Sequence, residues 1–513
     1  MIWGWLSSAS PIHIGLDGHK MTTPNILWIT TDQQRYDTIR AHGNTAINTP
    51  NLDRLAAEGM SFMNAYCQAP ICTPSRASFM TGRYPASHHV HRNGNDHFPP
   101  TERILPRILK DSTAYTTCLL GKHHLSRSED RIELIPEDGY DHAELCDCWP
   151  IGRAYDAWLK EKHGVEDPLK LYPELLQASP RDYGPGFPME MQQATWWGER
   201  ATAFIERQHD APWFMNLNAV DPHPPFFPPQ EFLDRYDPED MPLPLYRESD
   251  VARQEGFWDI DQQWKKIQDV RHYDPAEDID QSEIPLEQRN LFDFPPDTYD
   301  ARYVKACYYA MIEMIDDRVG AVLEALERTG QAENTIVIFT SDHGEMMGDH
   351  GMLYKGCRFF EGLVHVPLIV KWPGVTKPGS RSDALVELID IAPTLLEIAG
   401  TEIPYNMQGK SLVPLLRGET ETHKPHVVCE FNEALAGMPY QSHGTMVFDG
   451  RYKTCMYHKA GKAEIFDLQE DPGEFESLWD KPGFETEQIR LLKQHLDAVM
   501  ATSDAGIERT GNY

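Results

Sequence analysis

The chain is 513 residues long, and its hydrophobic and charged contents of 41% and 25% are ordinary for a water-soluble globular protein. A chain of this length buries a large core and is expected to form more than one domain. Its formal net charge of -32 argues against nucleic acids and anionic membranes as partners, because both need a basic surface. An anionic substrate would also be repelled unless its site concentrates positive charge or metal.

Nine cysteines occur at irregular spacing, which is not the pattern of a disulfide framework and favours a reducing compartment. The first twenty residues lack a cationic start and a long apolar core, so they make a poor signal peptide. We therefore expect a cytoplasmic protein with a disordered leader over residues 1–22 and Met21 as an alternative start. No apolar run approaches the length of a membrane span.

Short apolar strands alternate with helices through much of the chain. Residues 25–31 (NILWITT) are typical of a buried strand, and a short helix follows that Thr49 caps, Pro50 begins and Gly59 ends. Further expected elements are strands at 114–120, 213–220, 335–340 and 366–370, an amphipathic helix at 303–329 and a helix at 390–399. This alternation predicts an α/β fold with a parallel sheet covered by helices on both faces.

Two other regions differ from this pattern. Residues 130–300 are rich in Pro, Trp and Asp, and we interpret them as insertions and substrate loops within a catalytic domain over residues 23–420. Residues 421–513 are expected to form a smaller α+β subdomain with short antiparallel strands at 427–431, 444–448, 451–457 and 464–468. The apolar face of its terminal helix is predicted to contain Ile489, Leu492, Leu496 and Val499.

Polar residues follow four of the predicted strands directly. Ligands of open α/β sheets bind beyond the carboxyl ends of the strands, so these residues are expected to meet at one edge. Each alone is weak, because an Asp after a strand is usually a turn residue and a Lys-His-His run is usually solvated. Together they predict a divalent-metal site of mainly oxygen ligands with positive charge nearby for an oxyanion. The residues are Asp32, Gln33, Lys122, His124, His223, Asp342 and His343.

The most specific motif is the pentapeptide Cys72-Thr73-Pro74-Ser75-Arg76. With several other motifs it resembles the sulfatase family of the alkaline-phosphatase-like superfamily over residues 24–475. The others are Thr81-Gly82-Arg83-Tyr84-Pro85, Gly121-Lys122-His123-His124, Ser341-Asp342-His343-Gly344, Lys355 with Glu361-Gly362 and Val366-Pro367, and Ile465-Phe466-Asp467-Leu468 with Asp471-Pro472. The resemblance implies an alkaline-phosphatase-like α/β fold, with a mixed, mostly parallel sheet between helices and a smaller C-terminal α+β subdomain.

The resemblance also implies hydrolysis of sulfuric esters of aryl or small alkyl alcohols. In the family, the cysteine that corresponds to Cys72 is converted by a maturation machinery to formylglycine (3-oxoalanine). A metal-activated formylglycine hydrate then attacks sulfur and forms a covalent sulfo-enzyme intermediate. The implied metal is Ca²⁺ or Mn²⁺, and its implied ligands are Asp32, Gln33, Cys72, Asp342 and His343.

The remaining roles that the resemblance implies concern the substrate and proton transfer. Arg76 would hold the formylglycine oxygen, and Lys122 and His124 would orient and deprotonate the hydrate. His223 and Lys355 would bind the sulfate oxygens and assist the leaving group. Asn93 resembles an asparagine that contacts substrate in the phosphonate hydrolase branch, although a turn asparagine is an equally good interpretation.

Two departures from the family pattern keep alternatives open. Many sulfatases have Asp-Asp and Asp-Asn where this chain has Asp32-Gln33 and Asp342-His343. The combination is closer to the choline-sulfatase and phosphonate monoester hydrolase branches, so hydrolysis of phosphonate monoesters or phosphodiesters is an alternative. A further alternative, from another class, is a non-catalytic metal-binding protein in which Cys72 stays a thiol.

The alcohol part of the substrate is not specified by any motif. An aromatic wall could bind it, although core packing is the favoured interpretation of the residues concerned: Trp149, Trp196, Trp197, Phe226 and Phe227. Family resemblance also favours a homodimer or homotetramer.

Overall fold

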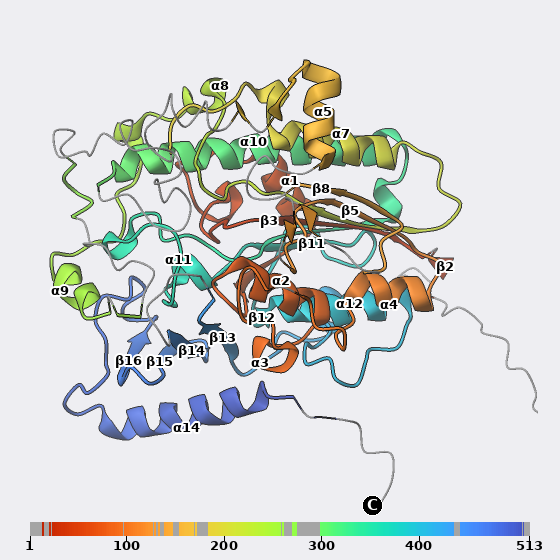
Figure 1. The fold of residues 1–513 in the computed structure, drawn as a ribbon. Coiled ribbons are helices and arrows are strands. Elements are labelled where there is room, and N and C mark those ends of the chain that lie inside the picture. The colour runs from red at the N-terminus through yellow and green to blue at the C-terminus, as the bar shows by residue number, and fades with distance from the viewer. Residues whose placement is uncertain are drawn as a thin grey trace, which may run out of the picture.

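An eight-stranded sheet forms the centre of the protein, which is described here by a computed structural model (Figure 1). The described residues are 13–14, 20–21, 23–95, 97–126, 128–129, 132–133, 138–146, 153–168, 170–171, 183–257, 259–260, 269–273, 298–434, 442–504 and 506. In spatial order, the strands are β12 (Ser380–Glu387), β4 (Met60–Tyr66), β11 (Leu368–Lys371), β10 (Thr335–Ser341), β3 (Asn25–Thr31), β9 (Trp213–Asn218), β5 (Thr116–Gly121) and β8 (His142–Leu145).

The sheet is parallel except at β11, so the expected mixed, mostly parallel sheet is confirmed. β10, β3, β9, β5 and β8 pair in parallel, as do β4 and β12, whereas β11 is antiparallel to both β10 and β4. The strands expected at 25–31, 114–120, 213–220 and 335–340 are β3, β5, β9 and β10, and the one expected at 366–370 is β11. Three strands, β4, β8 and β12, have no counterpart among the predicted elements.

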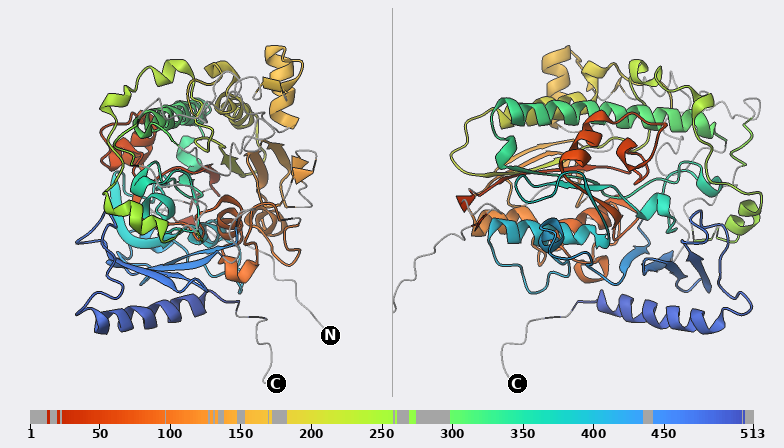
Figure 2. Two further views of the ribbon diagram at one scale, coloured as in Figure 1. Left: turned by 60° about the vertical axis from the view of Figure 1, so that its left-hand side comes forward. Right: turned by 180° about the vertical axis from the view of Figure 1, so that it is seen from behind.

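Both faces of the sheet are buried, which explains its nearly continuous apolar strands. On β3, Ile26 and Trp28 belong to one hydrophobic core, whereas Leu27 and Ile29 belong to the other. One face is covered by α1 (Pro50–Glu58), α7 (Gln193–Ile205) and α10 (Ala301–Arg328), and the opposite face by α2 (Cys72–Thr81), α4 (Leu105–Ser112) and α12 (Ile391–Ala399) (Figure 1). The view from behind in Figure 2 shows the same layers.

The remaining elements are short. The helices are α3 (Pro85–His88), α5 (Arg153–His163), α8 (Gln230–Leu233), α9 (Ser249–Glu255), α11 (Glu361–Val364) and α13 (Val413–Leu416). Two small strand pairs join β1 (His13–Ile14) to β2 (Lys20–Met21) and β6 (Ser128–Glu129) to β7 (Ile132–Glu133). The 3-10 turns are η1 (Arg40–His42), η2 (Met189–Met191), η3 (Pro238–Asp240), η7 (Ala332–Asn334), η8 (Asp349–Gly351) and η9 (Leu388–Asp390).

The cap of α1 differs from the expected one. The helix begins at Pro50 after Thr49, as predicted, but the Thr49 side chain makes no capping hydrogen bond. Its hydroxyl accepts a hydrogen bond from the backbone N–H of Arg40 instead. Asp316 of α10 accepts the N–H groups of Asn51 and Leu52, at 3.1 and 2.7 Å. A carboxylate that is distant in the sequence therefore caps α1, and the prediction that Thr49 does so is wrong.

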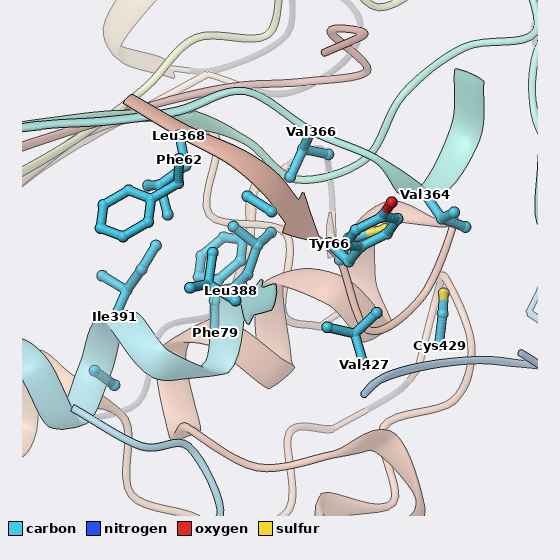
Figure 3. Packing of buried hydrophobic residues seen from close by; sticks show 14 of the residues in the cluster. Phe62, Tyr66, Phe79, Val364, Val366, Leu368, Leu388, Ile391, Val427 and Cys429 are labelled. Carbon is cyan, nitrogen blue, oxygen red and sulfur yellow. The ribbon is translucent and has the colours of Figure 1, made fainter. Parts of the chain in front are cut away.

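A second, antiparallel sheet lies beside the large one and contains β13 (Val427–Asn432), β14 (His443–Phe448), β15 (Tyr452–Tyr457) and β16 (Lys462–Asp467). All four expected C-terminal strands are therefore present. The expected catalytic domain over 23–420 and subdomain over 421–513 remain a prediction. Figure 3 shows that Phe62 and Tyr66 of β4 pack in one cluster with Val427 and Cys429 of β13, so the core is continuous between the two sheets.

The terminal helix α14 (Glu485–Ala501) covers the outer side of this small sheet (Figure 1). It buries Leu491, His495 and Ala498, and Ala498 packs against Val428 and Val447. Ile489 and Leu496 are 69% and 61% exposed, so the predicted apolar face is wrong for these two residues. The side of α14 that contacts the small sheet carries Ala498 and His495 instead. Ala498 packs on the sheet, and the hydroxyl of Thr445 lies 2.8 Å from His495 Nε2.

Core packing is confirmed for the aromatic residues that the structure describes. Trp196, Trp197, Phe226 and Phe227 are all buried, with exposed fractions of 4% or less, whereas Trp149 lies outside the described residues. In the described part of the chain, no helix combines the length and the apolar character that crossing a bilayer requires.

Glu430 of β13 generates a pH-dependent prediction for stability. Its carboxyl accepts a hydrogen bond from the Ala86 N–H at the start of α3. Burial raises the pKa of this carboxyl from 4.5 to about 7, and the hydrogen bond from Ala86 offsets only part of the effect. The folded state then binds the proton more tightly than the unfolded chain does. The free energy of unfolding therefore falls as the pH rises from 4.5 to 7.

We therefore expect Glu430→Gln to raise the free energy of unfolding at pH 8 by up to about 3 kcal/mol, since one pKa unit corresponds to about 1.4 kcal/mol. The gain should shrink as the pH is lowered towards about 5, where the carboxyl is protonated in the folded state. Urea unfolding of both proteins at the two pH values tests this, and a difference that does not depend on pH would contradict it.

Candidate active site

Side chains that follow neighbouring parallel strands meet the start of α2 at one edge of the large sheet. Asp32 follows β3, Asp342 and His343 follow β10, Lys122 follows β5, and Cys72 is the first residue of α2. All five residues are completely buried. Because β10, β3, β9 and β5 are adjacent and parallel, their carboxyl ends share one edge, and the predicted meeting of these residues is present.

Asp32, Cys72, Asp342 and His343 form a compact set of possible metal ligands, which we call the ligand group. One ligand atom from each lies within 4.8 Å of the others. The Cys72 sulfur is 3.6 Å from Asp32 Oδ1 and 3.2 Å from His343 Nε2. His343 Nδ1–H donates a hydrogen bond to the Gly344 carbonyl oxygen at 2.9 Å, and this contact directs Nε2 into the group. Histidine ligands are commonly held in this way, so the group fits a divalent cation.

Arg76 connects the two aspartates of the ligand group. Its Nε donates to Asp342 Oδ2 at 2.9 Å and its Nη2 to Asp32 Oδ2 at 3.2 Å. The same Asp32 oxygen lies 2.5 Å from the ammonium of Lys122. These ion pairs fix both carboxylates in position. The predicted role of Arg76, holding an oxygen on residue 72, stays a prediction.

Lys355 and Gln33 lie on another side of the ligand group. The Lys355 ammonium is 3.0 Å from the Cys72 sulfur, 3.5 Å from His343 Nε2 and 2.7 Å from Gln33 Oε1. The amide oxygen of Gln33 therefore lies on the same ammonium that contacts Cys72 and His343. Gln33 has a φ of 70°, a left-handed backbone conformation that residues other than glycine adopt at a cost in free energy.

The electrostatic environment favours charged forms in the site. Burial would raise the pKa of Asp32, but Lys122, His223 and Arg76 hold it well below its usual range. Burial would likewise raise the pKa of the Cys72 thiol, yet Lys122, Lys355 and His343 lower it well below its usual value. Burial opposes protonation of His343, but Asp342 raises its pKa to about 9. The positive charges therefore dominate the potential at Cys72.

Three further predicted residues lie near Cys72. His124 helps to lower the pKa of the Cys72 thiol, and burial lowers the pKa of His223 while Cys72 partly offsets this, so both histidines lie close to the thiol. The Asn93 side-chain oxygen accepts the Thr73 N–H at 2.9 Å, and the Asn93 N–H donates to the Ala434 carbonyl at 2.8 Å. Asn93 and His124 are half-buried whereas the ligand group is fully buried, so these two residues line the side of the site nearer to solvent.

Several supporting residues were not identified from the sequence. The Ser75 hydroxyl donates to the Asp342 carbonyl at 2.6 Å, and the Tyr308 hydroxyl donates to the Gln33 carbonyl at 2.6 Å. Ser341 Oγ donates to the His343 carbonyl at 2.9 Å, and the buried Glu345 accepts a hydrogen bond from Gln33 Nε2. Ser75, Ser341 and Glu345 lie in or beside the matched motifs, which was the available signal, whereas Tyr308 on α10 has none.

Comparisons with known proteins agree with this geometry. The model of the sulfatase family matches residues 24–401, and a model described as N-sulphoglucosamine sulphohydrolase, C-terminal, matches residues 348–502. An arylsulfatase of Clostridium perfringens is 30% identical, and the match covers 92% of this chain and 93% of the relative. The multifunctional alkaline phosphatase superfamily protein PehA of Trinickia caryophylli is also 30% identical, with 90% and 93% covered.

A solved structure, the phosphonate monoester hydrolase from Silicibacter pomeroyi, has the same fold with a TM-score of 0.77 and 24% identity, covering 94% of this chain and 96% of that one. The family model spans most of the chain, including the ligand group and Cys72 to Arg76. This chain belongs to the sulfatase family.

Proposed function

We propose that the protein hydrolyses sulfuric esters of aryl or small alkyl alcohols. The observation that carries the proposal is the position of Cys72, which begins α2 within Cys-Thr-Pro-Ser-Arg and is buried between the other members of the ligand group and Lys355. An arylsulfatase among the relatives supports the same substrate class.

Two additional groups belong to the proposal. Cys72 would be converted to formylglycine by a maturation machinery that also supplies the oxidant, and its hydrated aldehyde offers two hydroxyl groups on one carbon. One divalent cation, Ca²⁺ or Mn²⁺, would be held by residue 72 with Asp32, Gln33, Asp342 and His343, and it supplies a Lewis acid for the hydroxyl and the ester oxygens. A homodimer or homotetramer and a cytoplasmic location stay predictions.

The fixed cations explain how an acidic protein would bind an anionic ester. Arg76, Lys122 and Lys355 bring three positive charges to a site in which Asp32 and Asp342 supply the carboxylates of the ligand group. A divalent cation would add to this excess. The low dielectric of a fully buried site strengthens each of these interactions with the ester oxygens.

The histidines are placed for proton transfer. His223 Nδ1–H donates a hydrogen bond to the Pro224 carbonyl oxygen at 2.7 Å. Nε2 is therefore the ring nitrogen that would face the substrate. Since Nδ1 already holds one proton, Nε2 can deliver a proton to the leaving alcohol only from the doubly protonated imidazolium, and we expect the bound anionic ester to favour that form although burial lowers the pKa of His223. His124, on the more exposed side of Cys72, would accept the proton from residue 72, with Lys122 orienting it.

Hydrolysis of phosphonate monoesters or phosphodiesters is the second candidate. The observation that favours it is Gln33 beside Lys355, because this amide replaces the second aspartate of many sulfatases. The relative PehA, which is named a multifunctional alkaline phosphatase superfamily protein, supports keeping this second candidate.

A substrate comparison separates the two candidates. We expect purified protein of measured formylglycine content to hydrolyse nitrophenyl sulfate with a higher kcat/KM than the nitrophenyl ester of phenylphosphonate. Release of nitrophenol measures both reactions under identical conditions. Sulfate turnover that is lower by orders of magnitude would exclude the first candidate and favour the second.

The chemical state of residue 72 is a separate prediction. The peptide that contains Cys72, taken from protein made in its native host, should have exchanged one sulfur for one oxygen and lost two hydrogens. Mass spectrometry measures the change, and the peptide that contains Cys118 serves as an unmodified control. A peptide found only as the thiol would contradict both enzymatic proposals.

Lys355 is expected to contribute to binding and to the transition state. Lys355→Ala should lower kcat/KM for nitrophenyl sulfate by about 10²–10³-fold, because it removes a buried charge aimed at the oxyanion. Lys377→Ala, on the surface, is the matched control and should leave kcat/KM unchanged. Equal kcat/KM values for Lys355→Ala and Lys377→Ala would contradict the role of Lys355 in binding and in the transition state.

A further inference from the structure

Gln33 is held by a partner at every polar atom. Its N–H donates to Asp342 Oδ1 at 3.0 Å, and its carbonyl accepts from the Tyr308 hydroxyl at 2.6 Å. In its side chain, Oε1 accepts from the Lys355 ammonium and Nε2 donates to Glu345 Oε2. The two ends of the amide therefore have different and specific partners.

Glu345 accepts hydrogen bonds with both carboxylate oxygens. Oε1 accepts the backbone N–H groups of Met347, at 3.0 Å, and of Tyr354, which leaves Oε2 for the Gln33 amide. The side chain is completely buried, so water does not replace a lost partner.

These contacts determine which way the Gln33 amide faces. A lysine ammonium only donates, and the carboxylate of Glu345 accepts in all three of its contacts here. The amide nitrogen must therefore point to Glu345 and the amide oxygen to Lys355, whose ammonium contacts Cys72 and His343 of the ligand group. Only the oxygen end of an amide binds a hard cation.

We propose that Glu345 is a positioning residue that turns the amide oxygen of Gln33 towards the metal of the active site. The inference rests on the proposed function, because it takes Gln33 as a ligand of that metal. Glu345 acts through Gln33 and is not itself counted among the metal ligands.

The same carboxylate also positions Lys355. By accepting the Tyr354 N–H, Glu345 fixes the backbone directly before Lys355 in a segment where Tyr354 has a φ of 69°. One buried carboxylate thus sets the direction of an amide ligand and the place of a cation that contacts Cys72.

Glu345→Gln tests this role because it keeps the size of the side chain and changes one acceptor into a donor. The new amide nitrogen must face either Gln33 Nε2 or the N–H groups of Met347 and Tyr354. In both arrangements two buried N–H donors face each other with no acceptor between them, which costs free energy. We expect the variant to bind Ca²⁺ or Mn²⁺ about 10–100-fold more weakly than the wild type, measured by calorimetric titration of metal-stripped protein.

The Gln33→Glu background distinguishes positioning from general damage. With a carboxylate at position 33, the amide nitrogen that Glu345→Gln introduces meets a carboxylate oxygen, while the oxygen of the same amide keeps the two backbone N–H groups. Glu345→Gln should therefore cause no loss of metal affinity in this background. The four proteins form a double-mutant cycle in which the two substitutions are strongly coupled.

Glu430→Gln is the matched control, since Glu430 is also buried and accepts a backbone N–H, in its case from α3 and not from the segments that carry the ligand group. It should bind metal as the wild type does, and thermal unfolding reports whether each variant is folded. If Glu345→Gln lowers metal affinity equally with Gln33 and with Gln33→Glu, or lowers it in neither, the positioning role of Glu345 is wrong. The proposed metal site would not be affected by either result. A wild type that binds no metal would overturn the proposed metal site and this inference with it.

Discussion

The candidate active site depends on the burial of two carboxylates, for which Arg76 and Lys122 supply the ion pairs. Asp32 and Asp342 are removed completely from solvent, and unpaired charges in that position would cost several kcal/mol each. Arg76 binds both of them and is four residues after Cys72 on α2, so the two side chains share one face of the helix. The ion pairs that stabilise the aspartates therefore also place residue 72 within the ligand group.

Much of this arrangement was predictable because its signals are local. An apolar run that ends in a polar residue, as at Thr31-Asp32 and Ser341-Asp342, marks the carboxyl end of a buried strand. Parallel pairing then brings such residues together without knowledge of the strand order. The C-terminal strands were also predictable, since they are short runs that contain Val, Ile, Phe or Tyr and are separated by turn residues such as Asp449-Gly450.

What the sequence did not predict depends on partners that are distant in the chain. The cap of α1 comes from Asp316, 265 residues away, and only the packing of α10 against α1 brings it there. The face of α14 that meets the small sheet carries Leu491, His495 and Ala498, which leaves Ile489 in solvent. The sequence around Glu345 shows only that it follows a motif. Its three hydrogen-bond donors, on Gln33, Met347 and Tyr354, are brought to it by the fold.

The choice between sulfur and phosphorus cannot rest on charge. A sulfate ester, a phosphonate monoester and a phosphodiester each present one negative charge, which the cations of the site would attract equally. They differ in one substituent: the sulfate ester has a third free oxygen where the phosphorus esters have a carbon or a second ester oxygen. Lys355 would suit a free oxygen, because its buried ammonium donates hydrogen bonds. A bulkier substituent needs space on the side that Asn93 and His124 line, where the burial is lower. In the proposed function, selectivity would be decided at this more exposed side, and the ligand group would serve both chemistries.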